Sequence, residues 1–385
     1  MQSTPRPEDV MTNQPAPLTG TDESAAYIEA LEAEMGRFFA TQEELMTAVS
    51  VETLPLLESV RALSTGGKRL RALLAYWGYR GAGGAGVTDS IVRAGLAIEL
   101  FQTAALIHDD IIDASDTRRG APSVHRRFEA MHRQLGYKTN PATFGTSSAI
   151  LAGDTCLIWS EMVFSSIPEV TATSEARFIF DVMRTEVMAG QYLDIVGEVV
   201  PEEEPETALK RAKNVIRYKS AKYSCEHPIA LGGALALGLP HGEVSDLITG
   251  YRQFALPLGE GFQMRDDVLG VFGQPETTGK PAGDDLREGK RTVLTALTAM
   301  KSSPSQRAFL EESLGSPTLN AETIAQLQEL IRNSGALEAT EELIDAKGNQ
   351  ALAALQTLDG EAVNLEATVQ QALRAIAAKA LHRSF

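Results

Sequence analysis

The chain has 385 residues, with 35 basic and 51 acidic side chains, so its formal net charge at pH 7 is −16. This acidic excess argues against nucleic acid as a partner, because neutralising a phosphate backbone requires a surplus of lysine and arginine. Hydrophobic residues make up 43% of the chain, which is enough to bury a sizeable core and excludes a disordered protein.

Cysteine usage and hydropathy indicate the compartment. Cys156 and Cys225 lie far apart and lack metal-ligand spacing, so neither a disulfide framework nor a zinc site is expected. Residues 1–17 lack the apolar segment of a signal peptide, and no stretch reaches the roughly 18 to 20 apolar residues of a membrane span. We therefore expect a cytoplasmic protein without an integral membrane segment.

Helical periodicity runs through most of the chain. Residues 1–21 contain four prolines and few apolar side chains, which predicts a flexible N-terminal extension. From Asp22, apolar residues recur every three or four positions, and glycine, proline and asparagine separate the periodic segments. The pattern predicts one large all-α domain over residues 22–385. Beyond a first helix from Asp22, the predicted helices are 51–63, 68–80, 87–112, 121–134, 142–166, 174–199, 205–220, 222–238, 242–271, 289–301, 304–314, 319–334, 336–357 and 361–381.

An acidic cluster ends the apolar helix predicted over 87–112. Asp109 and Asp113 are four residues apart and project from one helix face, while Asp110 lies about 100° round the axis. Three carboxylates this close repel each other unless a cation lies among them, and oxygen ligands suit magnesium. A solvated acidic helix end would give the same pattern, and the neighbouring His108 is interpreted as structural.

Further charged strings lie elsewhere in the chain. Asp266 and Asp267 end a second long apolar stretch and can supply ligands from another wall of a cavity. The string Gly66-Gly67-Lys68-Arg69-Leu70-Arg71 puts exposed backbone N–H groups before a helix, beside two cationic side chains that favour an anion. Arg118 and Arg119 follow the first acidic cluster and add fixed positive charge.

Six strings, in order, resemble those of the trans-type isoprenyl diphosphate synthases of the polyprenyl synthetase family. They are GGKRLR at 66–71, LIHDDIIDASDTRRG at 106–120, GQYLD at 190–194, YKSA at 218–221, FQMRDD at 262–267 and GKPAGDDLREGKRT at 279–292. The resemblance implies an isoprenoid synthase-type helical bundle around a central cavity, and a homodimer. It also implies Mg²⁺-dependent head-to-tail (1'-4) condensation of isopentenyl diphosphate with dimethylallyl, geranyl or farnesyl diphosphate into all-trans prenyl diphosphates, with three Mg²⁺ ions when diphosphate is bound.

The resemblance also implies roles for individual residues. The implied metal ligands are Asp109, Asp110, Asp113 and Asp266, with support from Asp194, Asp267 and Asp285. The implied isopentenyl diphosphate site comprises Lys68, Arg71, Gln102 and Arg119, and the allylic diphosphate site comprises Arg118, Lys219, Lys280 and Lys290. The dipoles expected to steady the carbocation are the Lys219 carbonyl, the Ser220 hydroxyl and the Gln263 amide, which with Arg118 form the predicted catalytic set.

Product length depends on the residues that precede Asp109. Ala105, Ala104 and Phe101 lie four, five and eight positions before it and are expected to line the tunnel for the growing tail. Two small residues make a farnesyl stop unexpected, while Phe101, ~12 Å down the helix, is placed to form a floor for about four isoprene units. We therefore predict geranylgeranyl diphosphate, with ordinary core packing of Phe101 and longer polyprenyl products as the alternative.

Three other functions remain as alternatives. A class I terpene cyclase would carry an NDxxSxxxE-like second motif and would lack the isopentenyl diphosphate site. A non-catalytic synthase subunit would have lost an aspartate cluster or the arginine pair 118–119. A phosphohydrolase would need further histidine ligands around His108. One departure from the family pattern is Gly270, which stands where many relatives have the third aspartate of the second motif; we expect activity to survive it.

Overall fold

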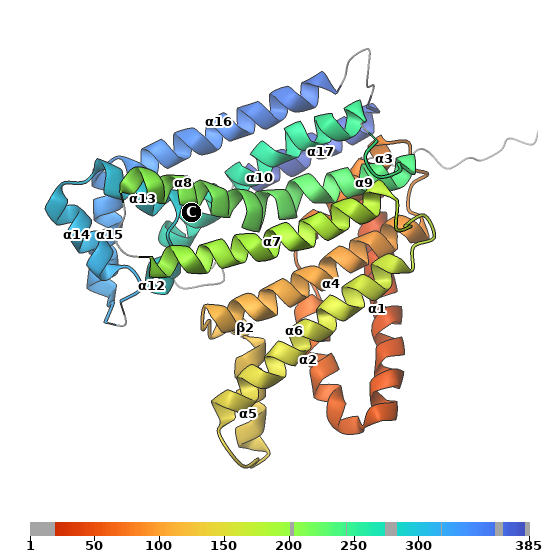
Figure 1. Ribbon diagram of the computed structural model, residues 1–385, viewed down its shortest axis with the longest axis horizontal. Helices are drawn as coiled ribbons and strands as arrows, with labels where there is room; N and C mark the ends of the chain where they lie inside the picture. The colour runs from red at the N-terminus through yellow and green to blue at the C-terminus, as the bar shows by residue number, and fades with distance from the viewer. Residues whose placement is uncertain are drawn as a thin grey trace, which may run out of the picture.

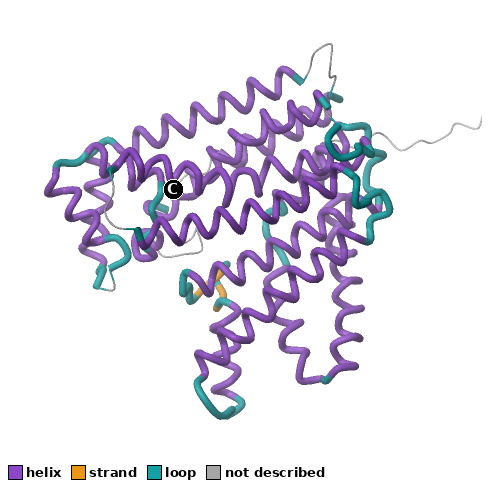
Figure 2. Tube along the Cα trace, in the orientation of Figure 1, coloured by secondary structure: helices purple, strands orange, loops and turns teal. Residues whose placement is uncertain are grey.

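Helices form almost all of the regular structure in a computed structural model of the chain, as the sequence predicts (Figures 1 and 2). The structure describes residues 20–200, 204–243, 245–273, 283–316, 318–358 and 365–381. The α-helices are α1 (Gly20–Val49), α2 (Leu54–Ser64), α3 (Leu70–Gly81), α4 (Asp89–Ile112), α5 (Val124–Gln134), α6 (Pro141–Ser165), α7 (Glu175–Val199), α8 (Pro205–Val215), α9 (His227–Leu237), α10 (Asp246–Phe272), α12 (Asp284–Glu288), α13 (Val293–Lys301), α14 (Pro304–Ser313), α15 (Ala321–Asn333), α16 (Ala336–Thr357) and α17 (Ala367–Leu381). The remaining elements are the 3₁₀ helix η1 (Val51–Thr53), the π-helix η2 (Ile216–Glu226), and the two-residue antiparallel strands β1 (Thr117–Arg118) and β2 (Ala121–Pro122).

Helix α4 is the central element and carries the first acidic cluster at its end. It packs against α3 and α6, and most of its apolar residues are fully buried. Among the described helices, it alone is long and apolar enough to cross a membrane, but 78% of that apolar window is buried inside the protein, as in the core helix of a globular fold. The Thr88 side chain caps its start by accepting from the Ile91 N–H, and Asp113 ends it.

One continuous helical rod replaces the two helices predicted over 205–220 and 222–238. Its middle part, η2, is a π-helix, a wide form that is rare and concentrated at functional sites. Glycines of both neighbouring helices allow its backbone to approach closely. A Cβ at Gly190 of α7 would lie 2.4 Å from the Lys219 amide nitrogen, and a Cβ at Gly259 of α10 would lie 2.7 Å from the Ala221 Cα. The π-helix is therefore held between α7 and α10 by direct backbone contact.

Several predicted boundaries differ from the structure for local reasons. The helix predicted from residue 68 begins at Leu70, because Gly66, Gly67 and Arg69 all have positive φ and form a loop. Residues Ala121–Pro122 belong to the small hairpin, so α5 begins only at Val124. Helix α1 begins at Gly20, and the rest of the predicted N-terminal extension lies outside the described residues.

Candidate active site

A cavity of about 810 Å³ is lined by residues of α4, α7, η2 and α10 and of the segments around α12. It collects most of the predicted site residues. Those that line it are Lys68, Arg71, Gln102, Ala105, Asp109, Arg118, Asp194, Lys219, Ser220, Gln263, Asp266, Asp267, Asp285 and Lys290.

The first wall of the cavity is the end of α4. Arg118, on the small hairpin, lies 3.2 Å from Asp109 Oδ2 and 2.5 Å from Asp110 Oδ1. Asp110 is fully buried and points to Arg118, whereas Asp109 lines the cavity. Burial opposes ionisation of Asp109, but Lys219, Lys290 and Arg118 outweigh it and hold its pKa below the ordinary value. Burial and the neighbouring Asp109 raise the pKa of Asp113 to about 6.

The second wall is the end of α10. Gln263 Nε2 donates to Asp267 Oδ1 over 2.8 Å, which fixes the amide for which the family resemblance implies a role beside the carbocation. Burial, with Asp285 as the next cause, raises the pKa of Asp267 to about 8. Asp266, the predicted metal ligand, lines the cavity beside it. Carboxylates that raise each other's pKa in this way bind a divalent cation readily, because the cation removes their repulsion.

Gly270 and Asp285 occupy one place in the second wall. A Cβ at Gly270 would lie 2.0 Å from Asp285 Oδ2 and 2.3 Å from its Cγ. The carboxylate of Asp285 therefore fills the space that a side chain at position 270 would need. Because both residues line the cavity, the missing third aspartate of the second motif has a carboxylate from α12 in its place.

Two lysines lie between carboxylates of different elements. Lys219 Nζ lies 2.6 Å from Asp194 Oδ2 and 3.4 Å from Asp109 Oδ1. Lys290 Nζ lies 2.6 Å from Glu288, 3.6 Å from Asp113 and 3.8 Å from Asp285. Burial disfavours both charges, but the carboxylates outweigh it and raise the pKa of each lysine, so both are cationic at neutral pH.

Arg71 and Lys68 form a second group of cationic side chains in the same cavity as Lys219 and Lys290. Arg71 Nη2 donates to Ser224 Oγ over 2.7 Å, and its guanidinium lies 4.4 Å from the centre of the Tyr223 ring. The Tyr223 hydroxyl donates to Gln102 Oε1 over 2.7 Å. Lys68 lines the same part of the cavity. Arg119 does not line it: its Nη1 donates to the Leu63 carbonyl, and its guanidinium lies against Gly67.

The predicted tunnel residues divide into two groups. Ala105 lines the cavity, but Ala104 and Phe101 are not among its lining residues. Phe101 is buried and packs edge-on against Tyr223, with ring centres 5.6 Å apart. Tyr223 lines the cavity, whereas Phe101 lies against the Tyr223 ring and does not line it. The floor assignment of Phe101 stays a prediction.

Sequence reasoning missed several lining residues. The sequence contained part of the information needed to find them. Tyr223 lies one helical turn after Lys219, and Thr292 is the last residue of the string at 279–292. The missed residues include Gln191, Tyr223, Asp284, Arg291 and Thr292. Lys280 lies outside the described residues.

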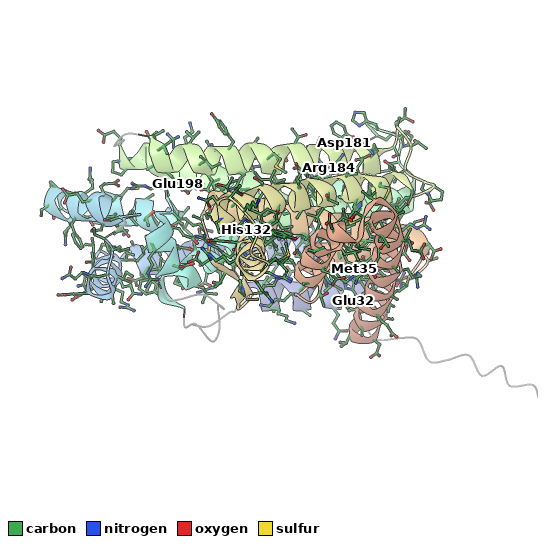
Figure 3. All side chains as sticks on the ribbon, turned by 90° about the horizontal axis from the view of Figure 1, so that it is seen from below. Glu32, Met35, His132, Asp181, Arg184 and Glu198 are labelled. Atoms are coloured by element: carbon green, nitrogen blue, oxygen red, sulfur yellow. The ribbon has the colours of Figure 1, made fainter. Side chains whose placement is uncertain are left out.

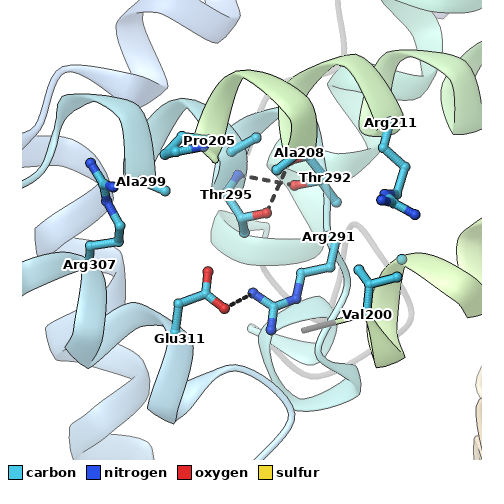
Figure 4. A pocket seen from close by; sticks show the side chains of 12 residues that line it. Val200, Pro205, Ala208, Arg211, Arg291, Thr292, Thr295, Ala299, Arg307 and Glu311 are labelled. Atoms are coloured by element: carbon cyan, nitrogen blue, oxygen red, sulfur yellow. Dashed lines mark hydrogen bonds and ion pairs between the residues drawn. The ribbon is translucent and has the colours of Figure 1, made fainter. Parts of the chain in front are cut away.

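A smaller pocket adjoins the cavity and shares Arg291 and Thr292 with it (Figure 4). Arg291 Nη1 lies 2.5 Å from Glu311 Oε2, and the Thr292 side chain accepts from the Thr295 N–H at the start of α13. These contacts fix the segment that carries Lys290.

The donor set fits magnesium. The wall residues offer only oxygen ligands, and Asp113 Oδ2 is buried without a hydrogen bond. In the described part of the chain, no three acidic, histidine or cysteine side chains already converge in metal-binding geometry. Arg118, Lys219 and Lys290 lie among the carboxylates instead. Magnesium typically takes only one or two carboxylates and completes its shell with water and phosphate oxygens, so these walls suit it when diphosphate is present.

Comparison with known proteins relates the chain to one family. The family model for polyprenyl synthetase matches residues 55–331. A geranylfarnesyl diphosphate synthase from Aeropyrum pernix is 30% identical over 74% of this chain and 81% of its own length. A geranylgeranyl diphosphate synthase from Saccharolobus solfataricus is 29% identical over 71% of this chain and 75% of its own. The crystal structure of geranylgeranyl pyrophosphate synthase from Corynebacterium glutamicum, complexed with isoprenyl diphosphate and magnesium, has a TM-score of 0.85 and 37% identity, covering 95% of this chain and 100% of that one.

Proposed function

Because the chain belongs to the polyprenyl synthetase family and is a trans-prenyltransferase, we propose that it condenses isopentenyl diphosphate with dimethylallyl, geranyl and farnesyl diphosphate to make geranylgeranyl diphosphate. The observation that carries the proposal is the composition of one cavity. Asp109 and Asp266 line it from different helices, and Lys68 and Arg71 line it from the loop before α3 and from α3. The allylic diphosphate would therefore bind through metal ions held by the aspartates, and isopentenyl diphosphate would bind through Lys68 and Arg71.

The residues of the cavity divide the work of the reaction. Lys219, Lys290 and Arg118 hold the allylic diphosphate while its C–O bond breaks, and fixed positive charge stabilises the leaving group. Magnesium, inferred as three ions held chiefly by the aspartates of both walls, would add positive charge at the same oxygens. The Ser220 hydroxyl, the Lys219 carbonyl and the Gln263 amide direct their negative ends to the allylic carbocation.

Bond formation and proton loss complete the reaction. The double bond of isopentenyl diphosphate attacks the cation, which forms the new carbon–carbon bond and leaves a positive charge on the isopentenyl part. Loss of a proton from the adjacent carbon neutralises that charge, and the electrons of the broken C–H bond form the new double bond. The described lining of the cavity contains no histidine. We assign the proton to the departing diphosphate, which carries the negative charge nearest the reacting carbons.

Product length is the finer part of the proposal. Ala105 lines the cavity beside Asp109, and the Tyr223 ring, which also lines it, packs against Phe101 of α4. This supports a stop at four isoprene units. If Phe101 is ordinary core packing and forms no floor, a longer polyprenyl product is the second candidate, and the names of the relatives include both lengths.

We also infer a cytoplasmic homodimer. Apolar side chains are exposed along α6 and α7, which Arg177 and Glu161 join through an ion pair of 2.5 Å. A second copy of the chain would cover them. The residues are Ile150, Leu151, Ile158 and Met162 of α6, and Met188 and Tyr192 of α7. Sedimentation of wild type and Ile158→Lys tests this: a monomeric wild type contradicts the dimer.

The test of the main proposal is direct. The purified enzyme, with magnesium, is incubated with isopentenyl diphosphate and each of the three allylic diphosphates, and product chain lengths are measured. We expect geranylgeranyl diphosphate from all three, and none from Asp109→Asn at the same protein concentration. Absence of condensation by the wild-type enzyme contradicts the function. Products beyond geranylgeranyl diphosphate leave the reaction intact and contradict only the proposed stop.

A further inference from the structure

Arg69 lies between two predicted substrate-binding residues but points away from the cavity. It does not line the cavity that Lys68 and Arg71 line, and its side chain is only 3% exposed. Burying a guanidinium is costly unless its donors are all paired. A side chain so placed in the middle of a substrate-binding string has a purpose other than contact with the substrate.

The guanidinium of Arg69 joins three helices. Nε and Nη2 donate to Glu32 Oε1 of α1 over 2.9 and 2.6 Å, and Nη1 donates to Glu99 Oε2 of α4 over 2.7 Å. Nη2 also donates to the Ser64 carbonyl at the end of α2 over 2.7 Å. Figure 3 shows Glu32 and the neighbouring Met35 together on α1. A lysine has no planar fork with which to reach all of these acceptors.

The backbone at Arg69 has a conformation that arginine rarely adopts. Its φ and ψ are 49° and 32°, a left-handed conformation that glycine adopts without strain and arginine does not. Glycine already occupies positions 66 and 67 of the same loop, also with positive φ. An arginine at 69 therefore keeps backbone strain that a third glycine would remove, which is consistent with a role for its side chain.

The other end of the loop is fixed in a similar way. Arg119 Nη1 donates to the Leu63 carbonyl over 3.0 Å, and its guanidinium lies against Gly67. The Ser64 and Thr103 hydroxyls are hydrogen-bonded over 3.0 Å, which ties the end of α2 to α4. These contacts lie before Lys68 and those of Arg69 lie after it, so Lys68 is held from both sides, and Arg71 lies in the first turn of the helix that follows.

We propose that Arg69 is a positioning residue for isopentenyl diphosphate: by holding the 66–70 loop to α1, α2 and α4, it sets Lys68 and Arg71 in place without touching the substrate. The inference rests on the proposed function, which assigns these two cations to isopentenyl diphosphate. It predicts a defect confined to one substrate, because Arg69 has no contact with the walls that hold the allylic diphosphate.

The experiment weakens the hydrogen bonds of Arg69 by changing either Glu32, which does not line the cavity, or Arg69 itself. Glu32→Gln removes a charge on α1 that is distant from the cavity, and Arg69→Lys keeps the charge but loses the fork. The matched control is Glu34→Gln, two positions along α1, where the carboxylate lies 2.6 Å from Arg37 and 3.9 Å from Arg93 and does not contact Arg69. Steady-state kinetics with farnesyl diphosphate as the allylic substrate give KM for each substrate and kcat, and thermal melting shows that each variant is folded.

We expect KM for isopentenyl diphosphate to rise about tenfold in Arg69→Lys and by a smaller factor in Glu32→Gln, because truncating one partner of a buried charged pair is costly. KM for farnesyl diphosphate and kcat at saturation should stay within about twofold, and Glu34→Gln should match wild type. Unchanged KM values in folded Arg69→Lys and Glu32→Gln overturn the inference. A fall in kcat without a change in KM also overturns it, since it assigns Arg69 to the chemical step.

Arg69→Gly gives a second test that separates strain from contacts. Glycine removes the backbone strain and the whole network at once. We expect it to bind isopentenyl diphosphate at least as weakly as Arg69→Lys does; wild-type binding by Arg69→Gly contradicts the proposal. A wild-type enzyme that condenses nothing would contradict the proposed function itself, which these variants do not test.

Discussion

Gly270 offers the sharpest test of the second wall. Replacing it by alanine puts a Cβ 2.0 Å from Asp285 Oδ2 and 2.3 Å from Asp285 Cγ, so the carboxylate of Asp285 must leave its place. Because a side chain can swing away, we expect the fold to survive. The displaced carboxylate is the one whose charge raises the pKa of Asp267, and it lines the cavity with Asp266. Residues that support metal ligands typically contribute about 10- to 100-fold in metal affinity or activity.

The expected result for Gly270→Ala is therefore a roughly 10- to 100-fold rise in the magnesium concentration that gives half-maximal condensation. Gly270→Asp displaces Asp285 too but brings a carboxylate of its own, so its defect should be smaller. Combining Gly270→Asp with Asp285→Ala should come closest to wild type, because a single carboxylate again fills the site. Magnesium titrations of the condensation rate compare the three variants, and thermal melting with magnesium and diphosphate gives a readout that does not depend on turnover.

The matched control is Gly36→Ala on α1, where a Cβ would meet nothing within 4 Å. It should leave magnesium dependence unchanged and raise stability by roughly 0.5–1 kcal/mol. Wild-type magnesium dependence in Gly270→Ala refutes the role given to Asp285. Higher activity in Gly270→Asp than in wild type shows instead that the second wall lacks a carboxylate.

Three further predictions concern other parts of the molecule. Phe101→Ala should lower stability by roughly 3–5 kcal/mol, because the ring is buried, and should shift products beyond geranylgeranyl diphosphate; an unchanged product distribution removes Phe101 as the floor. Gly190→Ala puts a Cβ 2.4 Å from the Lys219 amide nitrogen, so it should displace the π-helix and reduce kcat more than any alanine change at an exposed helix position; wild-type kcat would show that the contact can relax. Burial disfavours the Glu161 carboxylate, but Arg177, Ser165 and Arg184 outweigh it and lower its pKa to about 2; its stabilisation should be present above about pH 4.5 and be lost as the pH falls toward 2. The difference in melting temperature between wild type and Glu161→Gln should shrink over that interval, and a constant difference contradicts the assignment.

The sequence predicts the helices because they depend on local patterns: apolar spacing of three and four residues specifies a helix whatever its neighbours are. Charge and spacing also indicated the acidic clusters at Asp109 and Asp266. The roles of Lys219, Ser220 and Gln263 had a different source, the resemblance of six strings to the polyprenyl synthetase family.

Features that depend on contacts between distant segments were not predictable in the same way. The π-helix has the same apolar spacing as an α-helix over so short a length, and the glycines that let its neighbours approach it, Gly190 and Gly259, are far from it in sequence. Asp110 belongs to the acidic cluster by sequence, yet its carboxylate points to Arg118 because the hairpin folds back over the end of α4. The contact between Gly270 and Asp285 likewise requires α12 to return against α10.

Individual ion pairs in the cavity explain how a protein with a net charge of −16 can bind anionic substrates. Lys219 and Lys290 each lie between carboxylates, so a bare diphosphate that approached them would bring its own charge close to Asp109, Asp113 and Asp285. That repulsion disappears only if cations arrive with the diphosphate and are shared with the same carboxylates. The acidic excess in the cavity therefore favours diphosphate as its magnesium complex over the free anion, while Arg71, whose guanidinium is held by the Ser224 hydroxyl and the Tyr223 ring, suits a diphosphate that binds without metal.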